Sequence, residues 1–262
     1  ATEEEGSKVV LTPSDGEARY YYLDQMALDP YALFQDYPFL YDYHAKVKLV
    51  FCDNGDVWMP CVLNRHNIKG YIKGKYNDDH TKLIFKNGQP VYWAPNEKVY
   101  YVLALGDKTG GGAPSTSDAD NTTLTQDSET DATTNLYASD ITFDVDATTG
   151  VISFEVDPSK KWPFISIVNA ADPAESVYAI SANMKLVPAA NVDNNLQNYT
   201  YAYHNQRSDE DATSNVKVWV DGANYFFKGL NPKYPEMWVY GTLTKDGNSI
   251  LIPSLQVSKY DM

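Results

Sequence analysis

Short runs of alternating apolar and polar residues, separated by turn residues, occupy most of the chain. The runs Val47–Phe51 and Val57–Cys61 flank the turn Asp53-Asn-Gly-Asp56. Asn-Gly between two such runs is a strong hairpin signal, because both residues accept the positive φ that a tight turn requires. Two further runs follow at Tyr71–Tyr76 and Leu83–Phe85. The pattern predicts an antiparallel meander of four strands.

The same pattern of apolar and polar residues returns in residues 215–256, and it matches residues 45–89 strand by strand. Three pairs of positions are each 167 residues apart: Gly74 and Gly241, Leu83 and Ile250, Gln89 and Gln256. Two other pairs are 168 and 169 residues apart, so the copies differ by one residue in two loops: Trp58 and Phe226, Val47 and Val216. We therefore expect two copies of one β unit. The glycine inside each copy marks a bulge, a bend or the close approach of another backbone.

A different set of apolar runs lies between the two copies. It predicts strands at Val99–Leu105, Ile141–Val145, Val151–Val156, Phe164–Val168 and Val177–Val187. Residues 107–136 interrupt this set with Gly, Ser, Thr, Asp and Asn, a composition typical of a mobile surface loop. The expected organisation is a polar leader (1–7), a first meander (8–97), a middle meander with the acidic loop (98–183) and a second copy of the first meander (184–262).

Short strands, glycine and asparagine turns and the lack of a convincing amphipathic helix predict an all-β fold of antiparallel sheets. A sandwich and an up-and-down, lipocalin-like barrel both stay open, because both protect edge strands. An insertion at residues 23–43 of the first copy suggests one helical turn around Pro30–Gln35. The second copy stops just past Gln256, where the first continues into the middle meander. Either the natural chain ends there, or the two copies share that meander.

The charge balance narrows the possible partners. The net charge is −14 and the sequence pI is about 4.6, which disfavours binding to nucleic acid or to an anionic membrane surface. No apolar run approaches the ~18 residues of a transmembrane helix. Cys52 and Cys61 are expected on opposite arms of one hairpin, ~13 Å apart along the ladder. A disulfide requires Cα atoms within ~7 Å, so we expect two free, buried thiols.

Residues 224–256 contain a recognisable strand motif. They include Asn224-Tyr-Phe-Phe-Lys-Gly-Leu, Tyr234-Pro-Glu-Met-Trp-Val-Tyr-Gly-Thr-Leu and Ile250-Leu-Ile-Pro-Ser-Leu-Gln256. This series resembles the "GL…PEAWVKGT…PSGQ" motif of secreted β-repeat proteins of gut Bacteroidetes, which are often lipid-anchored and have no assigned function. Residues 140–150 are similar to the "TYDAATG" hairpin that tends to follow it. In the first copy the match is weaker, with Tyr71 in place of Trp238 and Cys61 in place of Gly229.

The resemblance implies an all-β protein exported to the outer-membrane surface or periplasm of a Gram-negative bacterium. It also implies that a lipid anchor can lie upstream of residue 1. The acidic opening Ala1-Thr-Glu-Glu-Glu is what remains when an export segment has been removed, although a trimmed cytosolic chain looks the same. The resemblance brings no catalytic residue with it.

Metal and catalytic motifs are weak in this sequence. The four histidines, His44, His66, His80 and His204, have no metal-ligand spacing, so we predict no metal site and no cofactor. Asp144-Val-Asp146 and Asp118-Ala-Asp120-Asn121 offer oxygen ligands but lack the EF-hand spacing, which leaves calcium as a lesser alternative. Glu155, Glu175 and Glu236 are the acids near strands or aromatic residues. Two facing carboxylates are needed for glycoside hydrolysis, and no catalytic pair is assigned.

Aromatic residues give the best functional lead, since 21 residues are tyrosine. Tyr92, Trp93 and Trp162 lie beside prolines, and we expect them in linkers, where they either bind a ligand or cover the core. The favoured function is a secreted or surface-anchored, non-catalytic binding module for a glycan, a peptide or a partner protein. One alternative is a structural module of a surface assembly, which predicts an exposed apolar edge or patch. The other alternative is a polysaccharide hydrolase.

Overall fold

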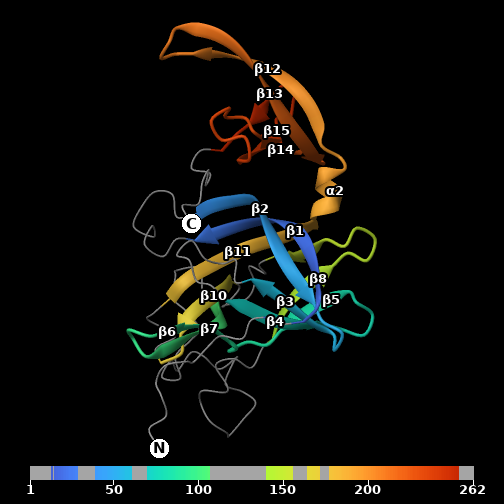
Figure 1. Ribbon diagram of the computed structural model, residues 1–262, viewed down its shortest axis with the longest axis vertical. Coiled ribbons are helices and arrows are strands. Elements are labelled where there is room, and N and C mark those ends of the chain that lie inside the picture. The colour runs from blue at the N-terminus through green and yellow to red at the C-terminus, as the bar shows by residue number, and fades with distance from the viewer. Residues whose placement is uncertain are drawn as a thin grey trace, which may run out of the picture.

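The computed structural model describes residues 13, 15–28, 39–60, 70–106, 140–155, 164–171 and 177–253 (Figure 1). Nearly all of its regular structure is antiparallel strand, which confirms the all-β prediction. The first eleven strands are β1 (Glu17–Leu28), β2 (Phe39–Phe51), β3 (Asp56–Pro60), β4 (Tyr71–Tyr76), β5 (Lys82–Phe85), β6 (Pro90–Ala94), β7 (Val99–Gly106), β8 (Ile141–Val145), β9 (Ile152–Phe154), β10 (Phe164–Asn169) and β11 (Val177–Pro188).

Eight of these strands close into a barrel, in the order β1-β2-β3-β4-β5-β8-β9-β11. Closure depends on β11, which pairs with β1 along one edge, from Tyr21 opposite Pro188 to Leu28 opposite Ile180. On its other edge β11 pairs first with β10 and then with β9. The sheet continues from β10 through β7 to β6. The structure thus decides between the two architectures left open by the sequence in favour of a barrel.

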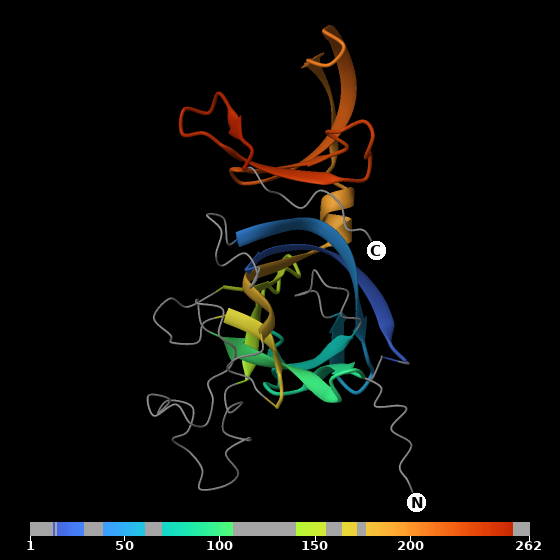
Figure 2. The same ribbon diagram turned by 90° about the vertical axis from the view of Figure 1, so that its left-hand side faces the viewer.

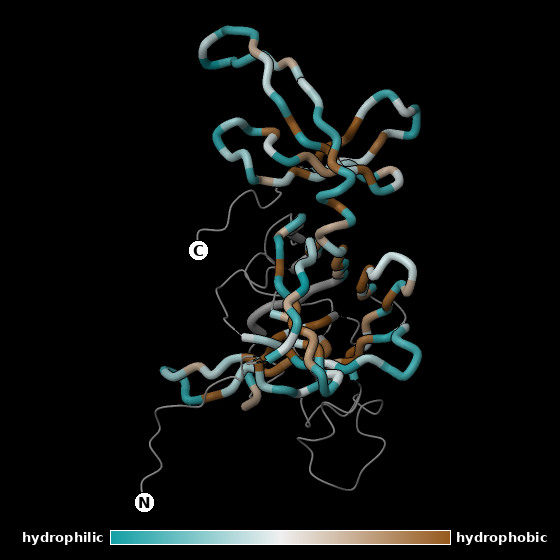
Figure 3. The backbone as a smooth tube through the Cα atoms, turned by 45° about the vertical axis from the view of Figure 1, so that its right-hand side comes forward, coloured by the Kyte–Doolittle hydropathy of each residue, from teal (hydrophilic) through white to brown (hydrophobic). Residues whose placement is uncertain are grey.

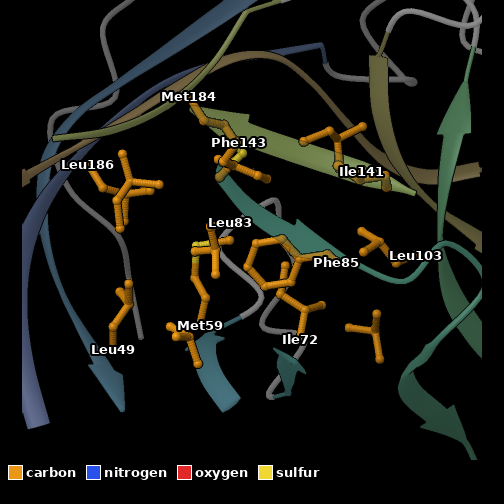
Figure 4. Packing of buried hydrophobic residues seen from close by; sticks show 14 of the residues in the cluster. Leu49, Met59, Ile72, Leu83, Phe85, Leu103, Ile141, Phe143, Met184 and Leu186 are labelled. Carbon is orange, nitrogen blue, oxygen red and sulfur yellow. The ribbon is translucent and has the colours of Figure 1, made fainter. Parts of the chain in front are cut away.

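One apolar core fills the barrel (Figure 4). Alternate residues of each strand point inward, as the period of two in the sequence predicts. β6, β7 and β10 contribute to the same core as the closed strands. The largest side chains that are fully buried are those of Phe85, Phe143, Leu23, Leu49, Met59, Leu83, Leu103, Ile141, Ile152, Ile165 and Ile167.

A short helix, α2 (Ala189–Asp193), leads from β11 into a second, five-stranded sheet. Its strands are β12 (Gln197–Asn205), β13 (Glu210–Asp221), β14 (Asn224–Lys228), β15 (Trp238–Leu243) and β16 (Ile250–Leu251), paired in chain order. The sheet curves into a half-barrel whose convex side faces the barrel (Figure 2). Hydrophobic segments gather in the barrel and at the base of the half-barrel, whereas the outer hairpins are mostly hydrophilic (Figure 3). No helix in the described part of the chain has the length and apolar character that a membrane crossing requires.

The half-barrel repeats the strand order of β1–β5, and the pairing registers of the two copies agree. Gly74 lies opposite Val57 in the first copy, and Gly241 lies opposite Tyr225 in the second. The glycine is needed for close packing, because a Cβ atom at Gly74 would lie 2.9 Å from the carbonyl oxygen of Ile84. Of the alternatives offered by the sequence, close approach of another backbone is therefore the one that applies at Gly74.

The turns of the two copies use the same hydrogen bonds. Asn77 N–H donates to the carbonyl of Lys82 (3.0 Å), and at the equivalent place Thr244 N–H donates to the carbonyl of Ser249 (2.8 Å). His80 has a φ of 58° where the second copy has a glycine, Gly247, with a φ of 73°. A histidine thus adopts the left-handed conformation at a position where glycine would be unstrained.

The structure corrects some details of the sequence analysis and does not reach others. The β11 strand runs through residue 184, where the second copy was expected to begin, so residues 184–188 belong to the barrel. In the Asn54-Gly55 turn only Gly55 has positive φ (85°), which corrects the expectation for both residues. Cys52 is a free thiol, as expected, but it is half-buried and not fully buried. The acidic loop, the expected helical turn at residues 30–35 and Cys61 lie outside the described residues.

Candidate functional site

The half-barrel exposes the face that corresponds to the interior of the barrel. Register fixes the correspondence, because Val50 opposite Trp58 in the first copy becomes Trp219 opposite Phe226 in the second. Counting along each strand from these anchors shows which residues take the places of the inward side chains. We call this surface the open face, and it consists of Tyr199, Val216, Val218, Val220, Tyr225, Phe227, Val239, Ile250 and Ile252. Its rim is exposed at Tyr199, Val220 and Ile252, whereas Val216 and Val218 at its centre are buried and the other four residues are half-buried.

Exposure differs sharply between equivalent positions of the two copies. Phe85 is 0% exposed in the barrel, whereas its equivalent in the half-barrel, Ile252, is 43% exposed. Tyr21 is 6% exposed, and its equivalent, Tyr199, is 52% exposed. Val220 on the same face is 42% exposed. At these three positions, side chains whose equivalents pack in the barrel are therefore in contact with water, whereas Val216 and Val218 between them stay buried.

The difference arises from the strands that close the barrel. In the first copy β8 pairs with β5, and β11 pairs with β1. Among the described residues, β16 has only β15 as a neighbour and β12 has only β13. The middle strands thus close the first copy, and within the described ranges none of them pairs with the second.

The convex side of the half-barrel is buried against the barrel by a cluster of aromatic rings. Trp219, Phe226 and Trp238 pack with Tyr22 of β1 and with residues of β11 and α2. Tyr22 O–H donates to Asp193 Oδ1 at 2.7 Å. Burial and this hydrogen bond both raise the pKa of Tyr22 above its ordinary value. This attachment leaves the open face directed away from the barrel (Figure 2).

His44 of β2 lies at the centre of that cluster. Its imidazole stacks on Phe226 with ring centroids 4.1 Å apart, and its centroid is 4.6 Å from that of Trp238. A β-bulge between β1 and β2 gives His44 a φ of 57°. Asp24 stabilises the bulge, because its Oδ1 accepts the His44 N–H at 2.9 Å and lies 2.6 Å from His44 Nδ1. The ring is fully buried, and its Nε2 atom has no hydrogen-bond partner among the described residues.

The aromatic residues predicted as a ligand platform lie elsewhere. Tyr92 and Trp93 are on β6 and not in a linker, because an edge strand tolerates Pro90 at its first position. Tyr92 packs against the barrel core, and Trp93 makes an edge-on contact with Tyr100 at 4.8 Å. Trp162 lies outside the described residues. The role of these three residues in ligand binding stays a prediction.

The candidate acids have ordinary structural roles where they are described. Lys228 Nζ lies 2.6 Å from Glu236 and lowers the pKa of that carboxyl, whereas a general acid needs a raised pKa. Asp146 accepts hydrogen bonds from the N–H groups of Thr148 and Thr149, which lower its pKa and stabilise the β8–β9 turn. Glu155 is exposed, and Glu175 lies outside the described residues.

The described part of the chain contains no cluster of side chains that could hold a metal ion. No group of three or more His, Cys, Asp or Glu side chains comes together there. Asp144, from one of the two acidic segments considered for calcium, forms an ion pair with Lys82 across the β5–β8 ladder. The other acidic segment, at Asp118–Asn121, is not among the described residues.

Comparisons with family models, with curated proteins and with solved structures return no match to this chain. The resemblance to secreted Bacteroidetes β-repeat proteins therefore stays a prediction. The open face itself was not found from the sequence, because both copies have the same apolar pattern.

Proposed function

We propose that this protein is a non-catalytic binding module whose half-barrel holds an apolar, extended segment of a partner polypeptide on its open face. The observation that carries the proposal is the contrast between Phe85, which is 0% exposed, and its equivalent Ile252, which is 43% exposed. A surface built like a core gains from being covered, because burial of apolar area is favourable. Export to the surface or periplasm of a Gram-negative bacterium is part of the proposal and is supported by the motif resemblance.

The chemistry of the open face favours a polypeptide over a sugar. Its side chains are mainly those of valine, isoleucine and aromatic residues, whereas sugar sites combine aromatic walls with several polar groups. Within the described residues β16 has one free edge, so its main chain can hydrogen-bond to an added strand. Strand addition supplies affinity through the main chain and specificity through alternate side chains.

The first copy shows how such a segment would sit. In the barrel the β8–β9 hairpin pairs with the edge of β5 and places Ile141, Phe143 and Ile152 in the core. The equivalent edge in the half-barrel is that of β16. A partner strand with apolar residues at every second position would therefore cover Ile250 and Ile252 as β8 covers Leu83 and Phe85.

A fluorescently labelled peptide of residues 140–155, the β8–β9 hairpin, is a direct probe. We expect it to bind the full chain in a fluorescence-anisotropy titration at moderate salt, which screens the negative charge of both molecules. The variant V220K/I252K should bind at least tenfold more weakly, since two charges then lie on the open face. L251K is the matched control, because Leu251 is 67% exposed and points to the opposite side of the same strand.

Melting temperature separates loss of binding from loss of folding. Val220 and Ile252 are already partly in water, so V220K/I252K should melt close to wild type. Two outcomes contradict the proposal. One is a wild-type chain that does not bind the hairpin, and the other is equal binding by V220K/I252K and L251K.

A further inference from the structure

The outer edge of β12 is unusual for an edge strand. It is nine residues long, and its sequence, Gln-Asn-Tyr-Thr-Tyr-Ala-Tyr-His-Asn, contains no Asp, Glu, Lys, Arg or Pro. Its pairing with β13 runs without a bulge from Gln197 opposite Val218 to Asn205 opposite Glu210. Natural edge strands are usually protected from pairing with other chains by charges, prolines, bulges or short length. The β12 strand has none of these protections.

Most of β12 lies in a ribbon that projects from the half-barrel (Figure 1). β14 pairs with β13 only from Lys217 to Asp221, so the part of β13 nearer the tip has β12 as its one neighbour in the described chain. Eight of the nine β12 side chains are exposed, Tyr201 being the exception. A two-stranded ribbon is marginally stable alone in water, and a third strand or a packed face is normally required.

The first copy shows that this edge is suited to pairing. β1 occupies the place of β12 in the barrel, and its outer edge pairs with β11 from Tyr21 to Leu28. At β12 the same edge lacks a neighbour within the described residues. The outer edge of β12 therefore has the strand geometry that pairing requires, and its sequence contains no feature that would prevent pairing.

We propose that β12 pairs with β12 of a second copy of this chain, antiparallel about a two-fold axis at Tyr201. This register places Tyr199 of one copy opposite Tyr203 of the other, and Tyr201 opposite Tyr201. The three tyrosines lie on one side of the strand, so the two strands form a continuous aromatic ladder. Aromatic cross-strand pairs stabilise antiparallel sheets. The two ribbons become one four-stranded sheet.

The distribution of charge favours the β12 edge as the place where two copies of the chain can meet. The chain has a net charge of −14, so contact between copies is opposed over most of the surface. β12 is uncharged, and in this register Asn198 meets His204 while Thr200 meets Ala202, so like charges never oppose each other. A two-fold dimer needs one self-complementary patch, and this strand provides it. The pairing goes beyond the proposed binding of a partner and leaves the β16 edge free.

Charge-swapped variants test both the contact and its register. Thr200 and Ala202 are exposed and lie opposite each other between copies. We expect the wild-type full chain to dimerise with increasing concentration in sedimentation velocity. T200K/A202K and T200E/A202E should each stay monomeric at concentrations where wild type is mainly dimeric, with melting temperatures near wild type. An equimolar mixture of the two variants should recover the dimer, because Lys then faces Glu at both positions.

The outcome can be separated from that of the binding proposal. V220K/I252K adds the same charge as T200K/A202K but on the open face, so it should lose the hairpin probe and keep the dimer. A wild type that remains monomeric throughout, a T200K/A202K variant that still dimerises, or a mixture that fails to recover the dimer would each overturn the proposed pairing.

Discussion

At the scale of single residues, Gly74 and Gly241 occupy equivalent places with different surroundings. A Cβ atom at Gly74 would lie 2.9 Å from the Ile84 carbonyl oxygen and 2.9 Å from the ring of Phe85, which is fully buried. At Gly241 the closest atoms are in side chains, Ile250 Cγ2 at 2.4 Å and Ile252 Cγ1 at 3.2 Å, beside the open face. Side chains at a partly open surface can move more easily than backbone in a closed core.

We therefore expect G74A to lower the free energy of unfolding by ~1–3 kcal/mol, the usual cost of overpacking. G241A should cost less than half as much, since Ile250 and Ile252 can shift toward solvent. Urea unfolding followed by tryptophan fluorescence measures both losses. Equal losses in the two variants would show that the second copy is as tightly packed as the first.

Tyr21 gives a pH-dependent prediction at the same scale. Burial raises the pKa of Tyr21 from 10.0 to about 12. Between these two pH values the unfolded chain has released the phenol proton while the folded chain retains it, so the free energy of unfolding falls as pH rises. Below pH 10 both states keep the proton, and this residue contributes no pH dependence.

The variant Y21F should make the decline in stability between pH 10 and pH 12 less steep than in wild type. Urea midpoints measured at several pH values across that range provide the test. Y199F is the comparison, because Tyr199 is the equivalent residue with 52% exposure. If both variants change the slope equally, the buried position has no special share in the alkaline loss.

At the scale of elements, the bulge at His44 joins the barrel to the half-barrel. The ring of His44 from β2 packs against Trp219, Phe226 and Trp238 from three strands of the half-barrel. The bulge directs the side chain out of the barrel, and Asp24 of β1 holds it there. One side chain from the first copy thus packs between the aromatic rings on the convex side of the second copy.

We expect H44A to lower the free energy of unfolding by ~2–4 kcal/mol, the range for emptying a buried site. The emission of Trp219 and Trp238 should shift to longer wavelength because water reaches the junction. H44F should retain most of the packing and lose less stability, although Asp24 then loses its contact with the imidazole. Unchanged stability and emission in H44A would mean that the junction does not depend on this ring.

The elements themselves were largely predictable from the sequence, for local reasons. Turn chemistry located the hairpins at Asn54-Gly55 and at Asp146–Gly150, and the period of two identified the strands. Tyr92 and Trp93 were misplaced because Pro90 and Pro95 suggested a linker, yet β6 is an edge strand that begins at the first of them. The bulge that turns His44 outward depends on pairing with Asp24, which no local pattern reveals.

At the scale of the whole molecule, the sequence revealed the duplication. It did not reveal that the first copy closes into a barrel while the second forms a half-barrel. Phe85 and Ile252 fit the same pattern, so periodicity predicted an inward side chain in both copies. Whether a face becomes a core depends on strands far away in the chain, such as β8 and β11. The candidate site therefore arises from strand pairing between distant segments, which a local pattern does not contain.

The closure of the first copy has a consequence for how the chain folds. Until β8 arrives, the edges of β5 and β16 are two similar acceptors for one hairpin. Tether length separates them weakly, because doubling a loop costs only ~0.6 kcal/mol in chain entropy. The choice depends on side chains instead: Lys82 pairs with Asp144 and Phe85 packs on Phe143 at 5.3 Å, whereas the second copy has Ser249 and Ile252 at those places. We therefore expect these two contacts to favour pairing of the hairpin with β5 over pairing with β16.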